Sequence, residues 1–329
     1  MMLIVDGSYY VARAQARMAN LSNSDGFPTG GIYGGLNMIG SDLSKCAPDY
    51  ACVVFDNAKD VSTPARCEIY PDYKSNRVPK TKEDKKASEI KHRSRKVVLD
   101  VLNFCGIRSV FAHKGWEADD TIASLASCAS RKGQKVLITT GDKDLSALVS
   151  NNVKVLDTKT TDGNSVKDYW REALNPKGVE DKYGVPPGRI LDLLALHGDA
   201  VDGIPGVPGF TRDTAAALIK EYGSLQKVHR AFVAGNDLGI NRKKAEGTLD
   251  NVKFLKRNLK LVQLNCDLIE EDDFNLDSYA INTQLKTRAN AVALLQEEFQ
   301  FKNIPQSLLK YLDSDKKMTA FKQRASMFD

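Results

Sequence analysis

The stretch Met2-Leu3-Ile4-Val5-Asp6-Gly7-Ser8 places an acidic residue at the end of a short apolar run. A short apolar run that ends in a turn residue is typical of a buried strand in a parallel sheet. The same arrangement returns in ACVVFDN at residues 51–57 and in KVLITTGDKD at residues 135–144. The repeated pattern predicts a sheet whose strands deliver carboxylates to a common edge.

Beyond this stretch, the first part of the chain alternates between predicted strands and predicted helices. The strands are expected at Met2–Val5, Tyr50–Phe55, Ile107–Phe111, Lys135–Thr139 and Val153–Leu156. The helices are expected at Gly35–Cys46, Arg95–Cys105, Ala118–Arg131 and Lys143–Val149. This alternation predicts an α/β fold with a twisted parallel sheet covered by helices on both faces. In open sheets of this kind, ligands bind beyond the carboxyl ends of the strands.

Acidic residues gather in short groups, most of them at these strand ends. They are Asp6, Asp56, Glu117, Asp119, Asp120, Asp142, Asp144, Asp199 and Asp202. Any one of them alone is more often a turn residue or a helix cap, or belongs to the acidic first turn of a helix. As a set in one cleft they would repel one another, and a divalent cation would remove the conflict. Because oxygen ligands suit Mg²⁺ or Mn²⁺, we expect a site for these metals.

From about Val179 the pattern becomes helical. Helices are expected at Pro186–His197, Arg212–Tyr222, Leu225–Ala234 and Asn251–Val262. We therefore expect an α/β domain at residues 1–178, a helical region at 179–311 and a flexible polar tail at 312–329. The tail is a candidate docking segment for another protein, although a frayed end is the simpler interpretation.

A Pro/Gly-rich segment, Gly203–Thr211, lies between two of these helices. Its glycines permit turns closed to other residues, and they let amide groups approach a phosphate at a helix N-terminus. The segment is interpreted as the hairpin of a helix-hairpin-helix element, which holds duplex backbone without reading sequence. An ordinary interhelical loop is the alternative. The candidate DNA-binding residues here are Gly206, Val207, Gly209 and Thr211.

A basic segment, Val78–Lys96, leads away from the Asp56 strand end and contains eight Lys and Arg residues against three acids. Because it has few apolar residues, it is expected to be exposed and flexible. A solvated loop is the ordinary interpretation of such a charge run, but beside a metal cleft it could guide a phosphate backbone. The candidate DNA-binding residues here are Lys80, Lys82, Lys85, Lys86, Arg93 and Lys96.

Composition narrows the class of protein. The 329 residues carry a net charge of +5, with 47 Lys and Arg against 42 acids. If nine acids bind metals, the remaining surface is clearly basic, which favours a polyanionic partner. The six cysteines are scattered without a CxxC pair, which indicates a reducing compartment and argues against zinc. No secretory signal or membrane-spanning run is expected, so we expect a cytoplasmic protein.

Two other site types fit the sequence less well. A phosphatase with an aspartyl nucleophile would need a second Asp two residues after the first, where this chain has Ser8. The Gly30–Gly34 stretch lacks the GxGxxG spacing and does not follow a predicted strand, so it does not indicate a dinucleotide site.

Five segments together resemble the 5′ nucleases, namely bacteriophage flap endonucleases and the 5′-nuclease domain of bacterial DNA polymerase I. In order they are IVDGS, VVFDN, YKSNR, EADD with TTGDKDL, and GDAVDGIPGVPGFT, and they span about residues 2–220. The resemblance implies a PIN-like fold with an arch insertion at about residues 74–97 and a helix-hairpin-helix. It departs at Gly203, where the family commonly has Asn, and at Trp116, where it often has Cys or Tyr. No polymerase region follows, so a stand-alone enzyme of the phage type is expected in a bacterial or phage-infected cell.

The resemblance also implies roles for residues. Asp6, Asp56, Glu117, Asp119 and Asp120 would serve a first metal, and Asp142, Asp144, Asp199 and Asp202 a second. Tyr73 would stack on a nucleotide, and Lys74 and Arg77 would contact the scissile phosphate. The hairpin would hold duplex DNA, with K⁺ on its carbonyls. Cleavage would leave a 5′ phosphate and a 3′ hydroxyl.

The expected substrate is DNA with a 5′ flap, overhang or nick, with RNA primers as a further candidate. We expect a monomer that acts in replication or repair, with replication proteins as candidate partners. Two alternatives stay open: a non-catalytic relative that only grips branched DNA, and a PIN-type ribonuclease. The filled acidic positions favour catalysis over the first, and the arch and hairpin argue against the second.

Overall fold

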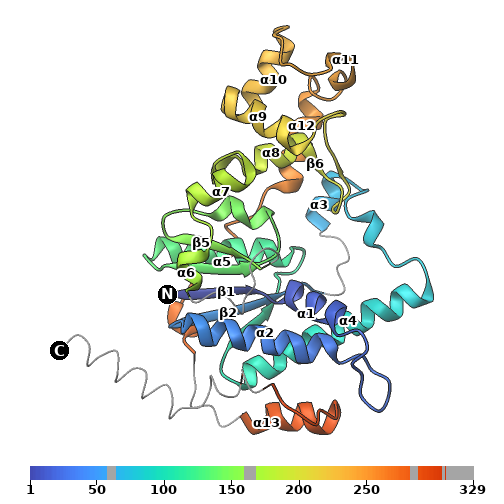
Figure 1. Cartoon of the computed structure of the whole chain (residues 1–329), viewed down its shortest axis with the longest axis vertical. Coiled ribbons are helices and arrows are strands. Elements are labelled where there is room, and N and C mark those ends of the chain that lie inside the picture. The colour runs from blue at the N-terminus through green and yellow to red at the C-terminus, as the bar shows by residue number, and fades with distance from the viewer. Residues whose placement is uncertain (58–63, 159–167, 282–287, 306–307, 309–329) are drawn as a thin grey trace, which may run out of the picture.

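The computed structural model describes residues 1–57, 64–158, 168–281, 288–305 and 308. The expected tail at 312–329 lies outside these residues. The described residues form a parallel sheet of five strands in the order β3-β2-β1-β4-β5 (Figure 1). The strands are β1 (Met2–Asp6), β2 (Tyr50–Phe55), β3 (Arg108–Phe111), β4 (Val136–Thr140) and β5 (Val153–Asp157). Each lies within one residue of its prediction, because short apolar runs between turns mark buried strands.

The two faces of the sheet are covered by different helices. Alternate residues of β1 belong to two separate cores, because successive side chains of a strand point to opposite faces. Met2 and Ile4 pack with α5 (Ala118–Arg131), whereas Leu3 and Val5 pack with α1 (Gly7–Arg17), α2 (Gly30–Cys46) and α4 (Lys82–Phe104). The α/β prediction with helices on both faces is therefore confirmed.

All five strands run in the same direction, so their carboxyl ends meet at one edge of the sheet. Asp6 ends β1, Asp56 follows β2, and Asp142 stands two residues beyond β4. The chain leaves β1 in one direction toward β2 and reaches β4 on the other side. Sheets of this type bind ligands at such a switch point.

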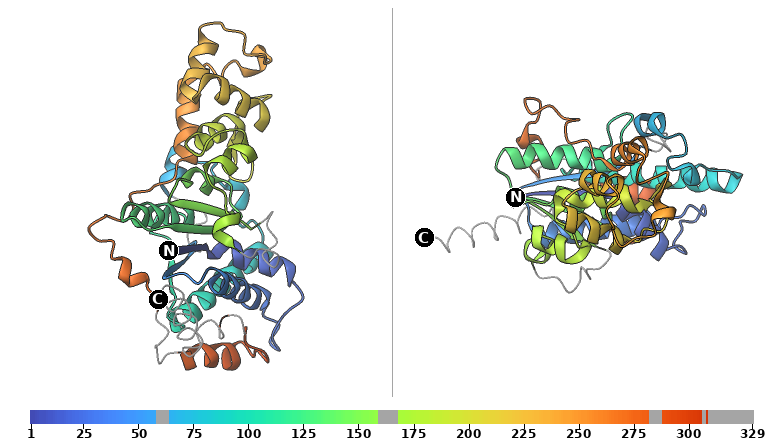
Figure 2. Two further views of the ribbon diagram at one scale, coloured as in Figure 1. Left: turned by 60° about the vertical axis from the view of Figure 1, so that its left-hand side comes forward. Right: turned by 90° about the horizontal axis from the view of Figure 1, so that it is seen from above.

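A helical region continues beyond the sheet and forms one end of the molecule (Figure 2). Its helices are α7 (Pro176–Tyr183), α8 (Ile190–His197), α9 (Arg212–Tyr222), α10 (Leu225–Val233), α11 (Arg242–Ala245) and α12 (Val252–Val262). Between α8 and α9 the chain makes a small antiparallel hairpin of β6 (Gly198–Asp199) and β7 (Ile204–Pro205). Two shorter helices are α3 (Pro64–Ile69) and α6 (Tyr169–Glu172).

The basic segment differs from its prediction. Rather than a flexible loop, residues 82–96 form the first part of α4, one helix of 23 residues. Its start is fixed by a capping box: the Thr81 hydroxyl accepts from the Asp84 amide, and the Asp84 carboxylate accepts from the Thr81 amide. The polar first turns of this helix stand out from the sheet, and its apolar last turns pack in the core.

Two other segments also differ from prediction. The sequence did not predict α1, and the segment expected to be helical at Lys143–Val149 is a 3₁₀ turn, Asp144–Leu148. Near the C-terminus, α13 (Arg288–Ala293) continues into a π-helical turn, Leu294–Glu298, and packs against α4 at the opposite end from the helical region (Figure 1). In the described part of the chain, no helix has the length and apolar character needed to cross a bilayer.

Candidate metal-dependent active site

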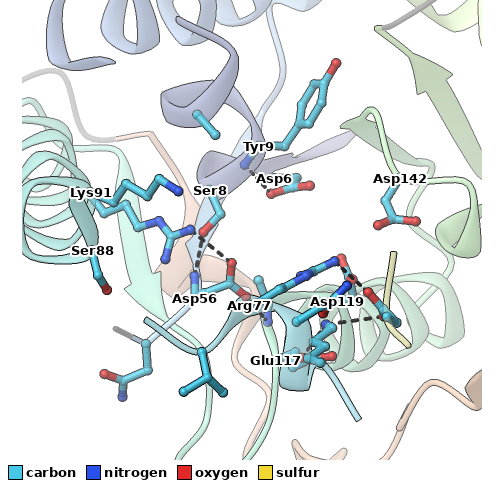
Figure 3. A pocket seen from close by; sticks show the side chains of 18 of the residues that line it. Asp6, Ser8, Tyr9, Asp56, Arg77, Ser88, Lys91, Glu117, Asp119 and Asp142 are labelled. Carbon is cyan, nitrogen blue, oxygen red and sulfur yellow. Dashed lines mark hydrogen bonds and ion pairs between the residues drawn. The ribbon is translucent and has the colours of Figure 1, made fainter. Parts of the chain in front are cut away.

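A cavity of about 700 Å³ opens at the carboxyl edge of the sheet (Figure 3). Its walls come from the ends of β1 and β2, the start of α5, the turn after β4, residues 74–80 and one face of α4. Six acidic residues predicted to bind metal line it: Asp6, Asp56, Glu117, Asp119, Asp142 and Asp202. Segments that are far apart in the sequence therefore place their carboxylates in one space.

Asp6, Asp119 and Asp142 form the most strongly repelling part of this set. Burial raises the pKa of Asp6 to about 7, and the nearby charges of Asp56 and Asp142 raise it further. Burial also raises the pKa of Asp119 well above its usual value, and Asp142 and Asp6 add to that shift. No described residue donates a hydrogen bond to the Asp119 carboxylate. These groups would be stabilised as anions by a bound cation.

Asp56 stands beside them but already has partners. Its backbone amide donates to the Ser8 hydroxyl at 2.7 Å, and its carboxylate accepts from the Ala118 amide at 3.1 Å. Arg95 of α4 lies 3.5 Å from the same carboxylate. Burial alone would raise the pKa of Asp56, but Arg95 and these hydrogen bonds outweigh it, so the pKa is lowered. Asp56 is thus held as an anion at the wall of the cavity.

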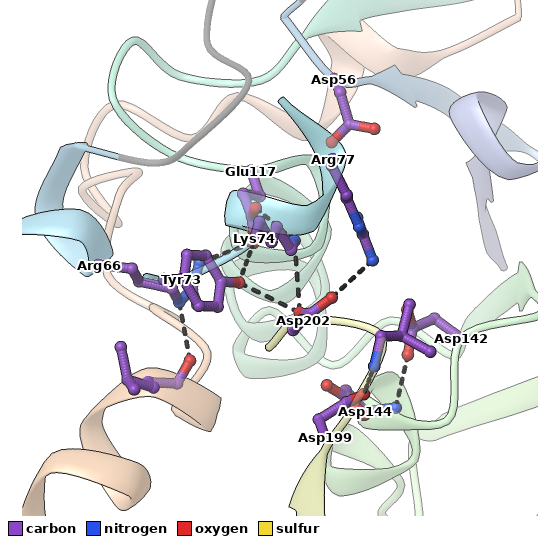
Figure 4. A network of polar contacts seen from close by, with 12 residues as sticks. Asp56, Arg66, Tyr73, Lys74, Arg77, Glu117, Asp142, Asp144, Asp199 and Asp202 are labelled. Atoms are coloured by element: carbon purple, nitrogen blue, oxygen red, sulfur yellow. Dashed lines mark hydrogen bonds and ion pairs between the residues drawn. The ribbon is translucent and has the colours of Figure 1, made fainter. Parts of the chain in front are cut away.

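A second acidic group lies next to the first and contains Asp144, Asp199 and Asp202 (Figure 4). Burial raises the pKa of Asp144 to about 7, and Asp142 adds to the shift. Lys143 Nζ lies 2.5 Å from Asp199 Oδ2 and 3.3 Å from Asp144 Oδ1. The charge of Asp142 therefore acts on both groups: on Asp6 and Asp119 in the first, and on Asp144 in the second.

Lys74 bridges two carboxylates across the cavity wall. Its Nζ atom lies 2.5 Å from Glu117 Oε1 and 3.4 Å from Asp202 Oδ2, while Arg77 holds the other Asp202 oxygen at 2.6 Å. Burial would raise the pKa of Glu117, but Lys74 and Arg66 outweigh it and lower it. The two residues predicted to contact the scissile phosphate thus line the cavity as cations.

Tyr73 differs from its predicted role in nucleotide stacking. Only 2% of the residue is exposed, and its hydroxyl donates to Glu117 Oε2 at 3.0 Å and Asp202 Oδ2 at 3.2 Å. Because a nucleobase cannot reach a buried ring face, Tyr73 positions carboxylates instead. Tyr9 and Trp116 are the aromatic side chains among the residues that line the cavity.

Asp120 also differs from its prediction as a metal ligand. It is fully buried and faces away from the cavity. Its two oxygens bind the Arg66 guanidinium at 2.7 and 2.8 Å, and they also accept from the amides of Glu117 and Asn265. With its oxygens committed in this way, Asp120 holds the start of α5 in place.

The residues present fit a hard divalent cation by their chemistry. They offer oxygen ligands alone, and burial, together with the neighbouring carboxylates, raises the pKa values of Asp6, Asp119 and Asp144. In the described residues, no three Asp, Glu, His or Cys side chains stand ready as a complete ligand set. Lys74, Arg77 and Lys143 instead pair with Glu117, Asp202 and Asp199. Metal binding would therefore exchange some of these ion pairs for metal bonds.

Helix α4 presents one basic face to the cavity. Ala87, Ser88, Lys91 and Arg95 line it at helical spacing, together with Lys80 just before the helix. Lys82, Lys85 and Lys86 are exposed on the first turns. The i, i+3, i+4 spacing would have identified Lys91 and Arg95, which the sequence prediction of DNA contacts omitted because it treated the segment as a loop.

Arg93 and Lys96 of α4 are not among the residues that line the cavity. Arg93 forms an ion pair with Glu298 at 3.0 Å, and its guanidinium lies over the rings of Phe27 and Phe299. Lys96 pairs with Asp100 one turn along the helix. Both side chains are more than half exposed, and their contact with DNA stays a prediction.

The residues of the predicted hairpin divide between packing and exposure. Val207 is buried and donates its amide to Leu196 O of α8, and a Cβ atom on Gly206 would lie 2.0 Å from the His197 oxygen. Gly209 is exposed with φ +84°, beside the side chain of Lys244. Thr211 caps α9 by accepting from the Thr214 amide. The turn is therefore held by the C-terminal end of α8 at Gly206 and Val207, and its tip at Gly209 is exposed to solvent.

Comparison with protein families gives two matches that together cover most of the chain. Residues 1–184 match the model "5'-3' exonuclease, N-terminal resolvase-like domain", and residues 185–286 match "5'-3' exonuclease, C-terminal SAM fold". A 5′-3′ exonuclease of Aquifex aeolicus is 36% identical over 282 residues, which cover 85% of this chain and 88% of that protein. DNA polymerase I of Mycobacterium leprae is 34% identical over 82% of this chain, but the match covers only 27% of the polymerase.

Solved structures give the same fold. A bacteriophage T5 flap endonuclease in complex with DNA and metal ions has a TM-score of 0.63 at 19% identity, covering 95% of this chain and 99% of that one. The catalytic core of Rad2 with DNA substrate has a TM-score of 0.59 at 15% identity, covering 94% and 90%. Zinc ions are bound in another T5 5′-exonuclease structure with a TM-score of 0.64.

Proposed function

The chain belongs to the 5′-3′ exonuclease family, and from this membership we propose that it is a structure-specific 5′ nuclease that cleaves DNA at 5′ ends and flaps. The observation that carries the proposal is the meeting of Asp6, Asp56, Asp119 and Asp142 in a cavity faced by a basic helix. The carboxylates would bind metal there, and the basic face would attract a phosphate backbone.

Two Mg²⁺ or Mn²⁺ ions would supply the chemistry of water activation and leaving-group stabilisation. One would be held by Asp6, Asp56, Asp119 and Asp142, and the other by Asp142, Asp144, Asp199 and Asp202, with Glu117 on the wall between Lys74 and Tyr73. The products would be a 5′ phosphate and a 3′ hydroxyl.

The cations of the cavity would act on the phosphate itself. Lys74 and Arg77 lie at the wall where Glu117 and Asp202 neutralise them. With Asp202 serving as a metal ligand, Arg77 would become available to a phosphate, and Lys74 would keep Glu117 as its paired carboxylate while facing the same phosphate. They would then stabilise the charge that grows on its oxygens during cleavage, which is usually a large part of catalysis.

The remaining surfaces would hold the rest of the substrate. The basic face of α4, with Lys80, Lys91 and Arg95, would guide the single-stranded 5′ arm past the metals. The exposed tip of the hairpin at Gly209 would hold the duplex, with K⁺ on its carbonyls. We keep the nuclease domain at residues 1–178, but the helical DNA-binding region would be shorter than the expected 179–311, because α13 packs against α4 at the opposite end of the molecule (Figure 1). The protein would act as a monomer in replication or repair.

The test is cleavage of a labelled 5′-flap duplex in Mg²⁺ and in Ca²⁺, with an Asp142→Asn variant in Mg²⁺. We expect cutting near the junction in Mg²⁺ alone and none by the variant, because Asp142 serves both acidic groups. Asp181→Asn, which changes an exposed carboxylate on α7, is the matched control and should cut normally.

Two outcomes would redirect the proposal. Tight binding of the flap without cutting in any metal would favour a protein that grips branched DNA. The cleavage rates of flap DNA, an RNA–DNA hybrid and plain RNA are compared side by side. Faster cleavage of plain RNA than of flap DNA would favour a ribonuclease.

A further inference from the structure

Helix α12 contacts the hairpin at one point and, at another, α3, whose Arg66 binds the cavity residue Glu117. It packs against α8 and β7 on one side and against α3 on the other. Its last turn leads directly into residues 263–265, which approach the start of α5. A single rigid element thus touches both surfaces that the substrate would occupy.

The contact with the hairpin is made by Asn258, which is fully buried on α12. Its side-chain amide donates to Ala195 O of α8 at 3.0 Å and to Pro205 O of β7 at 2.7 Å. Its oxygen accepts from the neighbouring Arg257. These hydrogen bonds fix the position of α12 relative to the hairpin.

The link from α12 toward the cavity is made by Arg66 of α3, which is 4% exposed (Figure 4). Its Nε donates to Leu261 O at 2.9 Å and its Nη2 to Gln263 O at 2.8 Å, both at the C-terminal end of α12. A guanidinium is favoured there because the helix end is electronegative. The same side chain grips Asp120 through two hydrogen bonds.

One further bond of Arg66 goes to a residue of the cavity. Its Nη1 donates to Glu117 Oε2 at 3.1 Å, where the Tyr73 hydroxyl also donates. Pairing with Asp120 already compensates the buried charge of Arg66, so burial alone does not require this bond. Because Arg66 also binds the end of α12, a shift of that helix end would move the Glu117 carboxylate with it.

We propose that Arg66 is a positioning residue through which binding of duplex at the hairpin sets the placement of Glu117 in the cavity. The route runs from Pro205 through Asn258 to α12, and from Leu261 and Gln263 through Arg66 to Glu117. The inference rests on the proposed function, because it takes the hairpin as the duplex-binding surface. Under this inference, duplex at the hairpin speeds the cleavage step itself, in addition to making the substrate bind more tightly.

The test compares two 5′-flap substrates with the same junction, one with a duplex long enough to cover the hairpin and one with a duplex too short to reach it. Single-turnover rates are measured at saturating enzyme, so that differences in affinity do not contribute. We expect the wild-type protein to cut the long-duplex substrate faster. We call the ratio of the two rates the duplex gain.

Arg66→Lys keeps the charge but cannot form the same fork of hydrogen bonds. We expect it to reduce the duplex gain by about fivefold or more, a usual size for coupling between two sites. Its affinity for the long-duplex substrate, measured in Ca²⁺, should stay within about threefold of wild type. Arg189→Lys, at an exposed arginine paired with Asp192, should keep the wild-type duplex gain.

A second variant keeps the test meaningful if Arg66→Lys folds poorly. Asn258→Ala leaves Arg66 and its carboxylates intact but releases the hairpin from α12. It should reduce the duplex gain to a similar degree, and the double variant should lose little more, because both residues lie on one route. Thermal unfolding of each variant identifies any loss of fold.

The outcomes separate the inference from the proposed function. If the wild-type protein cuts neither substrate, the proposed function fails. If it cuts both, but the variants slow the two substrates equally and leave the duplex gain unchanged, Arg66 has only a structural role and the inference is wrong. Additive losses in the double variant would likewise contradict a shared route.

Discussion

Lys74 is a buried cation that lies between two carboxylates, and its backbone is unusual for its residue type. Its φ angle is +52°, in the left-handed region that disfavours side chains. The Lys74 amide donates to Asp202 O at 2.9 Å, which holds this conformation against the acidic turn after β6. The strain is tolerated at the point where Nζ faces Glu117 and Asp202.

Lys74→Ala should lower the single-turnover cleavage rate by about 10²–10³, equivalent to about 3 kcal/mol or more, as for loss of one donor from an oxyanion hole. The reason is that Lys74 would neutralise charge on the scissile phosphate. Lys177→Ala, at an exposed lysine of α7, is the matched control and should cleave normally. A Lys74→Ala variant with the wild-type rate would remove Lys74 from the catalytic set.

The pKa of Asp6, about 7 in the folded protein, gives stability a pH dependence when metal is removed. Because this value lies above that of the unfolded chain, the folded state binds the extra proton between about pH 4 and 7. Stability is therefore highest below this window and is lost as pH rises through it. The raised pKa of Asp144, about 7, and of Asp42, about 6, act in the same direction.

Urea unfolding with a chelator should thus give a free energy of unfolding lower at pH 8 than at pH 5 by roughly 2 kcal/mol or more. Asp6→Asn should remove part of this difference, because the variant has no carboxyl to titrate there. Added Mg²⁺ should stabilise the wild-type protein more at pH 8 than at pH 5. A free energy of unfolding that rises from pH 5 to pH 8 in chelator would contradict the raised pKa values.

At the residue scale, the sequence indicated which carboxylates reach the cavity but not how each is used. Strand ends and short spacing are local signals, so Asp6, Asp56 and Asp142 could be placed in advance. Tyr73 and Asp120 could not, because their burial depends on partners far along the chain. Arg66, which binds Asp120 and also Leu261, 195 residues further along the chain than Arg66 itself, carries no local signal at all.

Helix α4 was not predicted over its first turns because that part of the sequence is dense in charged residues. Its first turns have few apolar residues, which suggested a flexible segment, yet Thr81 and Asp84 form a capping box that was readable in the sequence. The helix is anchored by its other half, where Val98, Leu99 and Leu102 pack in the core. For α1 the signal was weaker, since its buried face is formed mainly by Tyr10, Val11 and Ala14.

The hairpin between α8 and α9 depends on glycine at one close contact. A Cβ atom on Gly206 would lie 2.0 Å from His197 O, and backbone cannot move aside easily. Gly206→Ala should therefore destabilise the protein by about 3 kcal/mol and lower its Tm by about 5 °C or more. Scanning calorimetry measures the change.

Gly188→Ala is the matched control for this prediction. Gly188 is exposed before α8, with no atom within 4 Å of the added Cβ and without a positive φ. Its substitution should be neutral or should stabilise the protein by up to about 1 kcal/mol, because alanine restricts the unfolded chain. Equal effects of the two substitutions would show that the hairpin tolerates a side chain at Gly206.

Exposed cations are grouped on three helices of the molecule. They lie on the first turns of α4 and on the exposed sides of α11 and α12. In α11 and α12 these cations are Arg242, Lys243, Lys244, Lys253, Lys256 and Lys260. Exposed acids such as Glu83 and Glu89 share the first turns of α4, so the basic surface is local.

DNA affinity should consequently depend steeply on salt. With six or more phosphate contacts, the association constant for flap DNA in Ca²⁺ should fall on the order of 10³-fold between 50 and 200 mM salt. Lys85→Gln, at an exposed position of α4, should reduce the slope of log K against log salt by about one. Affinity that hardly changes with salt would mean that the phosphate backbone is not the main contact.

The two tryptophans of the chain have different surroundings. Trp116 lines the cavity just before Glu117, whereas Trp170 lies on α6 beneath the ammonium groups of Lys135 and Lys154. A Trp170→Phe protein would therefore emit from a single indole at the mouth of the acidic pocket. Indole emission changes when a nucleobase comes near or when the local polarity changes. Fluorescence of this protein would therefore report the binding of a nucleic acid or of ions in the pocket without an attached dye.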